Sequence, residues 1–433
     1  MSKTRSVAVA GAGWAGCTAA VELARRGHQV TLFDAARTLG GRARGVALHG
    51  HTLDNGQHIL LGAYRATLGM MKRVGVDAST ALLRLPLQMR YPPGGGMDFV
   101  AARLPAPLHV GVALFRATGL DRADKLALAR FSTSARWMGW NLHADCSVAE
   151  LLQRYDQTDN LVRLMWRPLC LAALNTPLEN ASANVFLAVL RDSLGARRAA
   201  SDMLLPRCDM GALFPVAAAE YVKKHGGTVR LGTKVAGITR AGSGWMLNAT
   251  EAFDAVVLAT PAATAATLLR DHAPDTAAQL DAFTYEPIVT VYLQYDAALR
   301  LALPMYALVD DARAGHWGQF VFDRGQLDAS QPGLLSVVVS AAAEAVAQDQ
   351  ATLAIAVAAQ LASTLQMPTL AQPVWTQVIA EKRATFACTP GLQRPANDIA
   401  LAGLVLAGDY TAGDYPATLE SAVRSGIAAA ALL

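Results

Sequence analysis

Three glycines near the start of the chain stand at a spacing that can hold a dinucleotide. They are Gly11, Gly13 and Gly16, in a G-x-G-x-x-G pattern. In such a pattern the first glycine permits a tight turn, the second lets the backbone approach a pyrophosphate, and the third lets a helix pack closely on a strand. Asp34 follows 23 residues after Gly11, where a carboxylate can accept hydrogen bonds from a ribose. The spacing therefore predicts a dinucleotide site.

The segments around these residues supply the elements that must position them. Residues 6–10 read as a short buried strand, 14–26 as a helix, and 29–33 as a second strand that ends at Asp34. The start of that helix points unsatisfied N–H groups at a phosphate. Strand, glycine motif, helix, strand and acid in this order are far more specific than the glycines alone. The expected contacts at the helix start and after the second strand are Trp14, Ala15, Asp34 and Ala35.

A second glycine motif follows the second strand, in the run Leu39-Gly-Gly-Arg-Ala-Arg44. Its position resembles that of the G-G-R motif of flavoproteins with two dinucleotide-binding domains. In those proteins the glycines pass close to the pyrophosphate and the arginine offers it a charged fork. The alternative is an ordinary Gly-Gly turn with solvated arginines. The resemblance assigns Gly40, Gly41 and Arg42 to an FAD site, and no second G-x-G-x-x-G is present for a separate nicotinamide nucleotide.

The far end of the chain resembles the C-terminal part of FAD-dependent oxidases and desaturases. Residues 404–409 read as an apolar strand ending in Gly408-Asp409, and a helix is expected from residue 417 to the C-terminus. The resemblance places Asp409 at the ribityl or phosphate region, and the N–H groups at Thr418 and Leu419 toward the flavin N1–C2=O edge. The alternative is a terminal amphipathic helix after a loop. By the same resemblance, Val235 contacts adenine and Thr260 lies near the cofactor.

The expected fold class is α/β, a two-dinucleotide-binding-domain flavoprotein with a discontinuous Rossmann-like FAD domain and an α+β substrate domain. The FAD domain comprises residues 1–75, 206–262 and 385–433, with further strands in 226–238 and 255–261. The substrate-binding domain comprises 76–205, which reads mostly as helix, and 263–384. In the latter, residues 288–295, 317–322 and 334–339 read as an antiparallel sheet, and 341–365 as an alanine-rich helix or helix pair.

Composition excludes several other classes of protein. Hydrophobic residues make up 53% and charged residues 17%, which argues against a disordered or fibrous chain. The net charge of +4 is too small for a dedicated nucleic-acid binder. The five scattered cysteines include no C-x-x-C pair, so we expect reduced thiols in a cytosolic protein and no metal site. The basic start and apolar run loosely resemble a signal peptide, but Glu22, Arg25 and Arg26 follow directly.

Residues 103–140 combine basic and aromatic side chains. No uncharged apolar run reaches the roughly 18 residues of a transmembrane helix, but this segment fits one that lies in a membrane interface. The alternative is a solvated arginine face over a normal core. The interfacial interpretation predicts a cytoplasmic protein that is peripheral at the inner face of the cell membrane. Its basic residues are Arg103, Arg116, Arg122, Lys125, Arg130 and Arg136, against the acids Asp121 and Asp124, with Trp137 and Trp140 beside them.

Over essentially its whole length the chain resembles the FAD-dependent amine-oxidase and phytoene-desaturase superfamily. The run Asp54-Asn-Gly-Gln-His58 matches the flavin-facing segment of carotenoid and squalene-associated desaturases, which assigns Gly56, Gln57 and His58 to the flavin. Residues 166–177, 204–206 and 213–215 are similar to the hydroxysqualene dehydroxylases of bacterial hopanoid synthesis, long labelled squalene-associated FAD-dependent desaturases. Amine oxidases usually carry a flavin-linked cysteine or an aromatic cage near the C-terminus. Here only Tyr415 is present, which counts against an amine substrate.

The closer resemblance implies reductive removal of the hydroxyl group of hydroxysqualene, which gives squalene. Because that hydroxyl is allylic, protonation and loss of water leave a delocalised cation that a hydride from reduced flavin N5 can quench. The protein must then supply an acid, exclude water and face the cation with π-electrons. His58 is the first candidate for the acid, unless it only forms a structural hydrogen bond to the pyrophosphate loop; Asp414 and Tyr415 follow. Trp166, Cys170 and Asn175 are expected to line a substrate tunnel or to belong to the core.

Two other functions remain open from the sequence. A carotenoid desaturase of the phytoene type would move hydride from substrate to flavin, and the sequence does not fix this direction. A non-catalytic prenyl-lipid-binding protein of the same fold would lack an intact flavin site, whereas all the glycine motifs are present here. The expected partners are a long-chain isoprenoid and a membrane surface, with no nucleic acid. The electron donor and the oligomeric state stay open.

Overall fold

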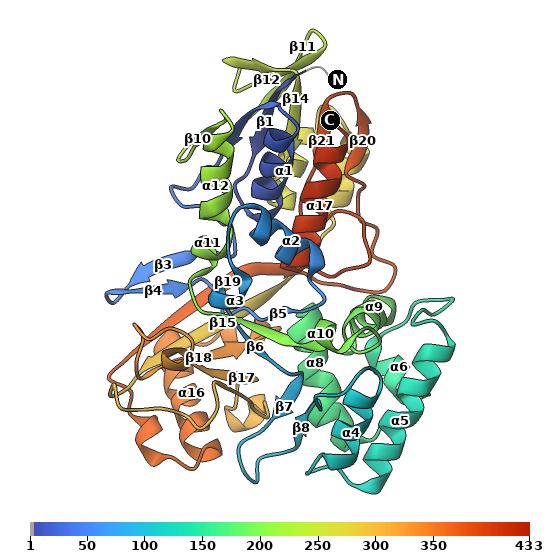
Figure 1. The fold of residues 1–433 in the computed structure, drawn as a ribbon, viewed down its shortest axis with the longest axis vertical. Helices are drawn as coiled ribbons and strands as arrows, with labels where there is room; N and C mark the ends of the chain where they lie inside the picture. Colours follow the sequence, from blue (N-terminus) through green and yellow to red (C-terminus); the bar gives the residue numbers. More distant parts are fainter. Residues whose placement is uncertain (1–3) are drawn as a thin grey trace.

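One mostly parallel sheet gathers strands from both ends and the middle of the chain (Figure 1). The computed structural model describes residues 4–433. All neighbouring strands of this sheet run parallel except the last pair, β21 and β20. Its strand order is β10 (Thr228–Arg230), β2 (Gln29–Phe33), β1 (Ser6–Ala10), β14 (Ala255–Leu258), β21 (Leu404–Leu406) and β20 (Asp398–Leu401). All six strands fall within the ranges predicted for the FAD domain.

Different elements cover the two faces of this sheet, because side chains alternate along each strand. On one face, Val7 and Val9 share a core with α1 (Trp14–Arg25), α12 (Pro215–Lys224) and α17 (Leu419–Ala431). On the other, Ala8 and Ala10 belong to a core that includes the antiparallel strands β11 (Ile238–Ala241), β12 (Gly244–Leu247) and β13 (Glu251–Phe253) and the helix α13 (Ala262–Leu269). The nucleotide-binding unit predicted around residues 6–34 is confirmed.

A second, antiparallel sheet forms the centre of the other domain. Its order is β16 (Met305–Ala307), β17 (Phe320–Asp323), β18 (Leu334–Val339), β15 (Tyr285–Gln294) and β19 (Trp375–Phe386). Helices α15 (Ala343–Val346) and α16 (Gln350–Thr364) share a core with this sheet, so the expected helix pair is present. The long strand β19 returns the chain to the nucleotide-binding domain (Figure 1). The predicted antiparallel sheet is confirmed, although β16 and β19 were not expected.

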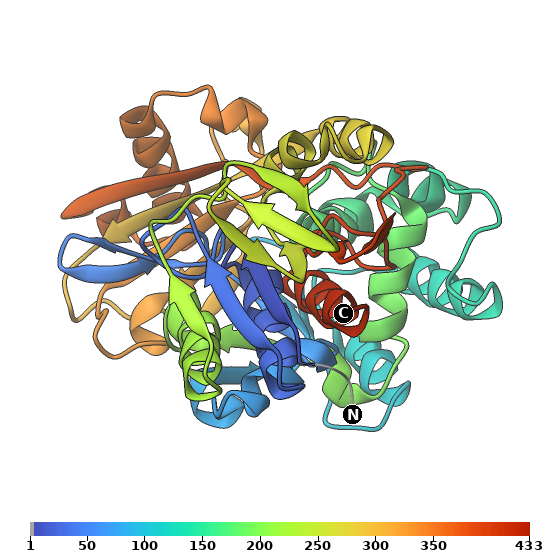
Figure 2. The same ribbon diagram turned by 90° about the horizontal axis from the view of Figure 1, so that it is seen from above.

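Helices dominate residues 76–205, the first part of the substrate-binding domain. They lie to one side of the antiparallel sheet in both views (Figures 1 and 2). Three small antiparallel sheets lie outside the two large ones, and their strands were missed because they are short. The helices are α4 (Leu108–Arg116), α5 (Arg122–Trp137), α6 (Val148–Arg154), α7 (Asp159–Leu161), α8 (Arg167–Leu174), α9 (Ala183–Ser193) and α10 (Arg198–Ser201), with a π-helical turn at Val162–Trp166. The strands are β3 (Gly45–Leu48), β4 (His51–Asp54), β5 (Leu60–Leu61), β6 (Leu82–Leu85), β7 (Gln88–Arg90), β8 (Asp98–Val100) and β9 (Met203–Pro206).

The remaining helices are short connectors. They are α2 (Arg65–Arg73), α3 (Ala78–Ala81), α11 (Met210–Leu213) and α14 (Pro274–Asp281), with 3-10 turns at Ala312–Ala314, Arg324–Gln326 and Pro368–Ala371. Among the described residues, no helix combines the length and the apolar character that crossing a bilayer requires. The same residues contain no group of three or more His, Cys, Asp or Glu side chains arranged to hold a metal ion.

Candidate functional site

The loop between β1 and α1 has the shape of a phosphate cradle. A Cβ atom on Gly11 would lie 2.3 Å from the carbonyl oxygen of Ala259, and one on Gly16 only 1.8 Å from that of Gly11, so packing within the chain excludes side chains there. Gly13 differs, because the nearest neighbour of such a Cβ is Gly41 Cα at 3.9 Å. Gly13 is also the N-cap of α1 and offers no side-chain cap, which leaves N–H groups of the first turn open. Together these features leave room and donors for a phosphate.

The second glycine motif packs directly on this loop. Gly40 N donates to the carbonyl oxygen of Ala12 over 2.9 Å, and Gly13 and Gly40 form an isolated parallel bridge. The carboxylate of Asp34 lies beside them and accepts from Ala12 N and Ala36 N, both at 2.7 Å. A carboxylate has about four acceptor positions, so two of them remain for ribose hydroxyls. The predicted dinucleotide residues are therefore brought together at one end of the parallel sheet.

The segment predicted to meet adenine lies next to Asp34. Thr233 N donates to the carbonyl oxygen of Asp34 over 2.7 Å, and Asp34 N donates to that of Arg230 over 3.0 Å. Val235, two residues further along, is buried in the core. Val235 thus lies close in the chain to the segment that is hydrogen-bonded to Asp34, as expected for a residue near the adenosine. Its contact with adenine stays a prediction.

Arg42 and Asp409, both predicted to contact FAD, form an ion pair with each other. Nη2 of Arg42 lies 2.6 Å from each carboxylate oxygen of Asp409, and its Nη1 donates to the carbonyl oxygen of Ala384 over 2.7 Å. Burial lowers the pKa of Arg42, but the Asp409 carboxylate more than offsets this effect. The G-G-R motif is thereby joined to the Gly408-Asp409 motif, although the guanidinium group faces the carboxylate and its contact with pyrophosphate stays a prediction.

The start of α17 is fixed by its own first turn. The side chain of Thr418 caps the helix by accepting a hydrogen bond from Ser421 N over 3.2 Å. Glu420 is fully buried, accepts from Ala66 N and Thr67 N at the start of α2, and pairs with Arg424 at 2.8 Å. Glu420 was not predicted, since a buried carboxylate looks like a surface residue in a sequence. Contacts of Thr418 and Leu419 with flavin stay predictions.

Arg394 is a second residue that sequence reasoning missed, and it shapes the loop after β21. Its guanidinium group donates to the carbonyl oxygens of Asp409 at 3.0 Å, Gly413 at 3.0 Å and Tyr415 at 2.7 Å, and also to that of Thr411. The same group lies over the ring of Phe386, 5.1 Å from its centroid. The only sign of its role in the sequence is that Arg394 is the one charged residue between Arg383 and Asp398. Arg394 therefore holds residues 409–415 in a single conformation.

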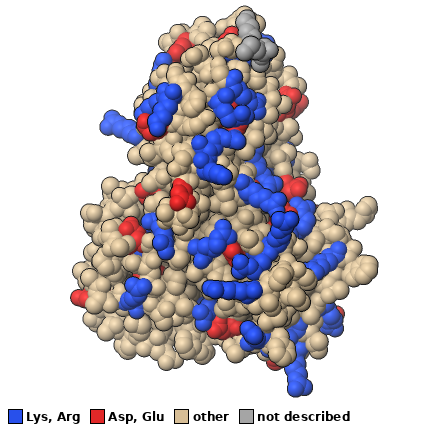
Figure 3. Space-filling view, viewed as in Figure 1, with Lys and Arg blue, Asp and Glu red and all other residues tan. Residues whose placement is uncertain are grey.

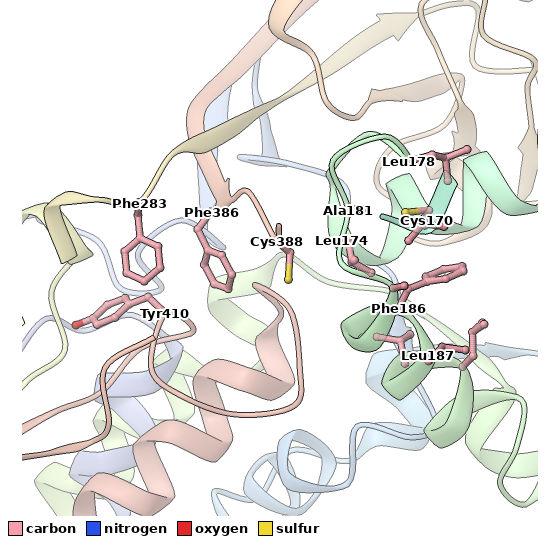
Figure 4. Packing of buried hydrophobic residues seen from close by; sticks show 14 of the residues in the cluster. Cys170, Leu174, Leu178, Ala181, Phe186, Leu187, Phe283, Phe386, Cys388 and Tyr410 are labelled. Carbon is pink, nitrogen blue, oxygen red and sulfur yellow. The ribbon is translucent and has the colours of Figure 1, made fainter. Parts of the chain in front are cut away.

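Aromatic rings gather beside this loop. Phe283 and Phe386 lie 5.5 Å apart and Phe283 and Tyr410 lie 6.5 Å apart between ring centroids, and Figure 4 shows the three rings side by side. All three are buried, and the hydroxyl group of Tyr410 has no hydrogen-bond partner among the described residues. These rings present π-electrons close to Asp409.

The segment 54–58 is held from the antiparallel sheet. The side-chain oxygen of Gln57 accepts from Nη1 of Arg324 at 2.9 Å and from Ser336 Oγ at 3.2 Å, and Arg324 is itself almost completely buried. Tyr292 donates its hydroxyl hydrogen to the carbonyl oxygen of Asp54 over 2.9 Å. Burial raises the pKa of Asp54 to about 6. This segment is thus fixed by contacts that span both domains.

Several buried polar atoms, some beside this segment and one beside the Gly11 loop, have no partner within residues 4–433. They include Nδ1 of His58 and the hydroxyl groups of Thr260 and Thr290. A Cβ atom on Gly56 would lie no closer than 3.8 Å to Thr290 Oγ1 and 3.9 Å to His58 Cε1, so space remains here as well. Buried polar atoms in native proteins are nearly always paired. Unpaired atoms, open N–H groups at α1 and the room over Gly13 and Gly56 fit a bound flavin nucleotide.

His58 and Thr260 were predicted at this site, whereas Thr290 was missed. A threonine within the apolar strand run of β15 is the signal that could have found it. Burial lowers the pKa of His58 to about 4, so its imidazole is neutral near pH 7. His58 is therefore a poor proton donor as it stands in the structure, and its contact with flavin stays a prediction.

Asp414 and Tyr415 lie at the edge of the same loop. The side chain of Asp414 is 69% exposed and contacts Arg191 at 3.5 Å, whereas the hydroxyl group of Tyr415 donates to Asp192 over 2.6 Å and its ring lies under Arg424. No hydrogen bond within residues 4–433 joins either of them to His58. Their role as acids stays a prediction, and the structure gives Tyr415 a place in a charged network.

The three residues expected to line a substrate tunnel lie in the core. Trp166 is 1% exposed and donates to Gln157 Oε1 over 2.9 Å, and Cys170 is buried beside Leu178 and Ala181 (Figure 4). Asn175 ends α8 in a left-handed conformation with φ 49°, donates to Thr385 Oγ1 and accepts from Ala341 N. Because their polar groups already have partners, the structure favours packing over substrate contact for all three.

Comparison with known proteins identifies the family. The sequence model described as "Flavin containing amine oxidoreductase" matches residues 14–433. Hydroxysqualene dehydroxylases of Rhodopseudomonas palustris and Sinorhizobium fredii are 29% and 27% identical, over 100% and 99% of this chain and 99% and 98% of their own length. A probable zeta-carotene desaturase of Synechococcus elongatus is 26% identical over 53% of this chain and 50% of its own.

Solved structures show the same fold. A putative protoporphyrinogen oxidase from Exiguobacterium sp. 255-15 aligns over 100% of this chain and 98% of its own, with 19% identity and a TM-score of 0.69. A triple mutant of putrescine oxidase aligns over 99% and 98%, with 16% identity and a TM-score of 0.73. Both are similar in fold alone at this identity. With the FAD-shaped site described above, these matches show that the chain is an FAD-dependent oxidoreductase that belongs to the flavin-containing amine oxidoreductase family.

Proposed function

We propose that the chain is a hydroxysqualene dehydroxylase, which removes the hydroxyl group of hydroxysqualene reductively and forms squalene. The observation that carries this proposal is similarity to hydroxysqualene dehydroxylases along the whole chain, including both parts of the substrate-binding domain. Carotenoid desaturases match only about half of the chain or less. A lipid-binding protein without flavin is disfavoured, because the glycine loops and unpaired buried atoms keep the site suited to FAD.

The reaction needs one proton and one hydride for each hydroxyl group that leaves as water. Reduced FAD supplies the hydride. The chain supplies the surroundings: Arg394 and the Arg42–Asp409 pair fix the loop at the start of α17, whose positive N-terminal end stabilises negative charge nearby. The buried rings of Phe283, Phe386 and Tyr410 lie together beside this loop, and their π-electrons would stabilise an allylic cation formed next to them.

The proton must come from a group that holds it near neutral pH. His58, with its pKa lowered to about 4 by burial, holds that proton only where added negative charge in the site raises its pKa again. Tyr410, whose buried hydroxyl group lacks a partner among the described residues, keeps its proton near neutral pH because burial raises its pKa, but the same shift makes it a weaker acid. Replacing His58 with alanine tests the assignment when FAD content is measured on the same preparation.

The decisive experiment is a single turnover without oxygen. Photoreduced protein is mixed with hydroxysqualene, and we expect squalene by mass spectrometry with simultaneous oxidation of the flavin. Desaturation of phytoene under oxidising conditions, with no squalene formed, would establish the carotenoid desaturase instead. A colourless protein that binds the isoprenoid would establish the lipid-binding alternative. Squalene at the wild-type rate from the His58→Ala variant would remove His58 from the mechanism.

The substrate and product of this reaction are long hydrocarbons that partition into bilayers. We therefore propose that the protein works in the cytoplasm, peripheral to the inner face of the cell membrane. The flavin must be reduced by an electron donor before each turnover.

A further inference from the structure

Helices α4 and α5 expose four large apolar side chains at one end of the molecule. Phe115 is 83% exposed and Trp137 is 87% exposed, and Leu108 and Leu126 are also mostly exposed. Single exposed apolar residues are common on soluble proteins, but a group of them marks an interaction surface. Figures 1 and 2 place both helices at the outer edge of the molecule, in the domain that does not carry the parallel sheet.

The end of α4 lies against the first turn of α5. Nζ of Lys125, in the first turn of α5, donates to the carbonyl oxygen of Phe115 at the end of α4 over 3.0 Å. Along α5 one exposed stripe follows at spacings of three or four residues, and its opposite face is buried. The stripe therefore mixes two basic and two large apolar side chains with one threonine. Its members are Arg122, Leu126, Arg130, Thr133 and Trp137.

The positive charge of this surface is not neutralised by neighbouring carboxylates. Asp121 caps α5, and Asp124 is buried with hydrogen bonds from Thr158 and Asn160, so both acids are used inside the fold. Some exposed arginines elsewhere have carboxylate partners, as in the pairs Arg154–Glu150 and Arg270–Asp281, whereas this surface gathers six basic residues without one among the described residues. Within residues 4–433 no ion pair involves Arg103, Arg116, Arg122, Lys125, Arg130 or Arg136.

We propose that the α4–α5 surface, defined by Leu108, Phe115, Leu126, Trp137 and the six basic residues above, docks on an anionic lipid bilayer. Trp137 and Phe115 enter the boundary between headgroups and acyl chains, while the arginines contact lipid phosphates. Charge complementarity favours lipid, because interfacial helices combine basic and aromatic groups in this way and the inner leaflet is negative. In Figure 3, basic side chains project at the lower right, where Figure 1 places these helices.

Flotation with vesicles tests this surface in the FAD-loaded protein. We expect wild-type protein to float with vesicles containing phosphatidylglycerol at low salt, and to stay in solution with phosphatidylcholine alone or at high salt. The Arg122→Gln/Arg130→Gln variant should bind about 30-fold more weakly, because each basic residue near an anionic surface strengthens binding about fivefold. The Phe115→Ser/Trp137→Ser variant should lose at least about tenfold, since the apolar contact disappears.

Matched controls separate this surface from general effects. Val216→Ser/Lys224→Gln changes one exposed apolar and one exposed basic residue on α12 in the other domain, and it should float like wild type. All variants should keep wild-type FAD content and turn over detergent-solubilised hydroxysqualene at the wild-type rate, because none of these residues touches the flavin site. Failure of the dehydroxylation proposal would therefore leave the flotation result intact.

Three outcomes would overturn the docking proposal. Wild-type protein that stays soluble at low salt with anionic vesicles would do so directly. Equal flotation of the surface variants and the control would move the contact elsewhere on the molecule. The third outcome is that no protein floats, that the wild-type protein is a dimer, and that Phe115→Ser/Trp137→Ser converts it to a monomer. This result would show that a second copy of the chain covers the surface.

Discussion

Replacing Gly13 with alanine should weaken FAD binding while the fold stays intact. The backbone of Gly13, with φ −74° and ψ −178°, suits an alanine, and the added Cβ has 3.9 Å to Gly41 Cα. Alanine gains about 0.4–1 kcal/mol by restricting the unfolded chain but is a poorer N-cap, so the free energy of unfolding should stay within about 1 kcal/mol of wild type. The methyl group instead occupies the room over the N-terminus of α1 that we assign to phosphate.

The loss of affinity follows from the open N–H groups of α1. A hydrogen bond to a charged group contributes about 1.5–3 kcal/mol, so displacing phosphate from one N–H weakens FAD binding about 10- to 150-fold. Gly16→Ala is the matched contrast, because its Cβ would lie 1.8 Å from the carbonyl oxygen of Gly11 and must push helix and strand apart. We expect that variant to lose about 3 kcal/mol or more of stability.

Two measurements on FAD-free protein distinguish these effects. Urea unfolding gives the free energy of unfolding, and quenching of flavin fluorescence on titration gives the dissociation constant. Wild-type affinity in Gly13→Ala would refute the phosphate cradle at this loop. Equal loss of stability in the two variants would refute the distinction between Gly16, where packing within the chain excludes a side chain, and Gly13, where the room is left for the ligand.

Three further substitutions test the buried charges and polar groups. Because burial raises the pKa of Asp54 from 3.8 to about 6, the folded state binds more protons between these values and its stability falls as pH rises. Asp54→Asn should remove this fall, which amounts to about 3 kcal/mol over the whole pH window. His58, with its pKa lowered to about 4, acts in the opposite direction in both proteins, so parallel unfolding profiles would contradict this assignment. Arg394→Ala should lower the free energy of unfolding by about 2–4 kcal/mol and reduce FAD content, with partial rescue by lysine, since four carbonyl oxygens lose their donor. Asn175→Ala should destabilise the substrate-free protein by about 2–3 kcal/mol in thermal or urea unfolding, whereas a tunnel residue would leave stability unchanged and raise KM.

The nucleotide-binding unit could be predicted almost to the residue because its signals are local. The bounds of β1 and β2 agree with the predicted strands, and α1 ends one residue before the prediction. Strand β19 was missed although it is the longest in the described chain. Its run through Glu381, Lys382 and Arg383 is charged and largely exposed, so it lacks the apolar alternation that marks β15 and β18.

The contacts that build the site depend on residues far apart in the sequence. Arg42 and Asp409 each belong to a recognisable motif, but their ion pair joins positions 367 residues apart and becomes visible only in the fold. Arg324, Arg394 and Glu420 were missed for a related reason. A charged residue in a sequence is expected at the surface, and only tertiary structure shows that its partners are buried with it.

If FAD pairs the unpaired atoms of the site, its binding is linked to the stability of both domains. A buried polar atom without a partner costs about 1–3 kcal/mol, and Thr260 lies in the nucleotide-binding domain while Thr290 lies on β15 of the other. A ligand that pairs both atoms binds the folded state alone and stabilises it by mass action. His58, on the segment that Arg324 and Tyr292 hold from the antiparallel sheet, adds a third such atom. FAD should therefore act as a structural connection between the domains, and removing it should loosen their junction before it unfolds either sheet.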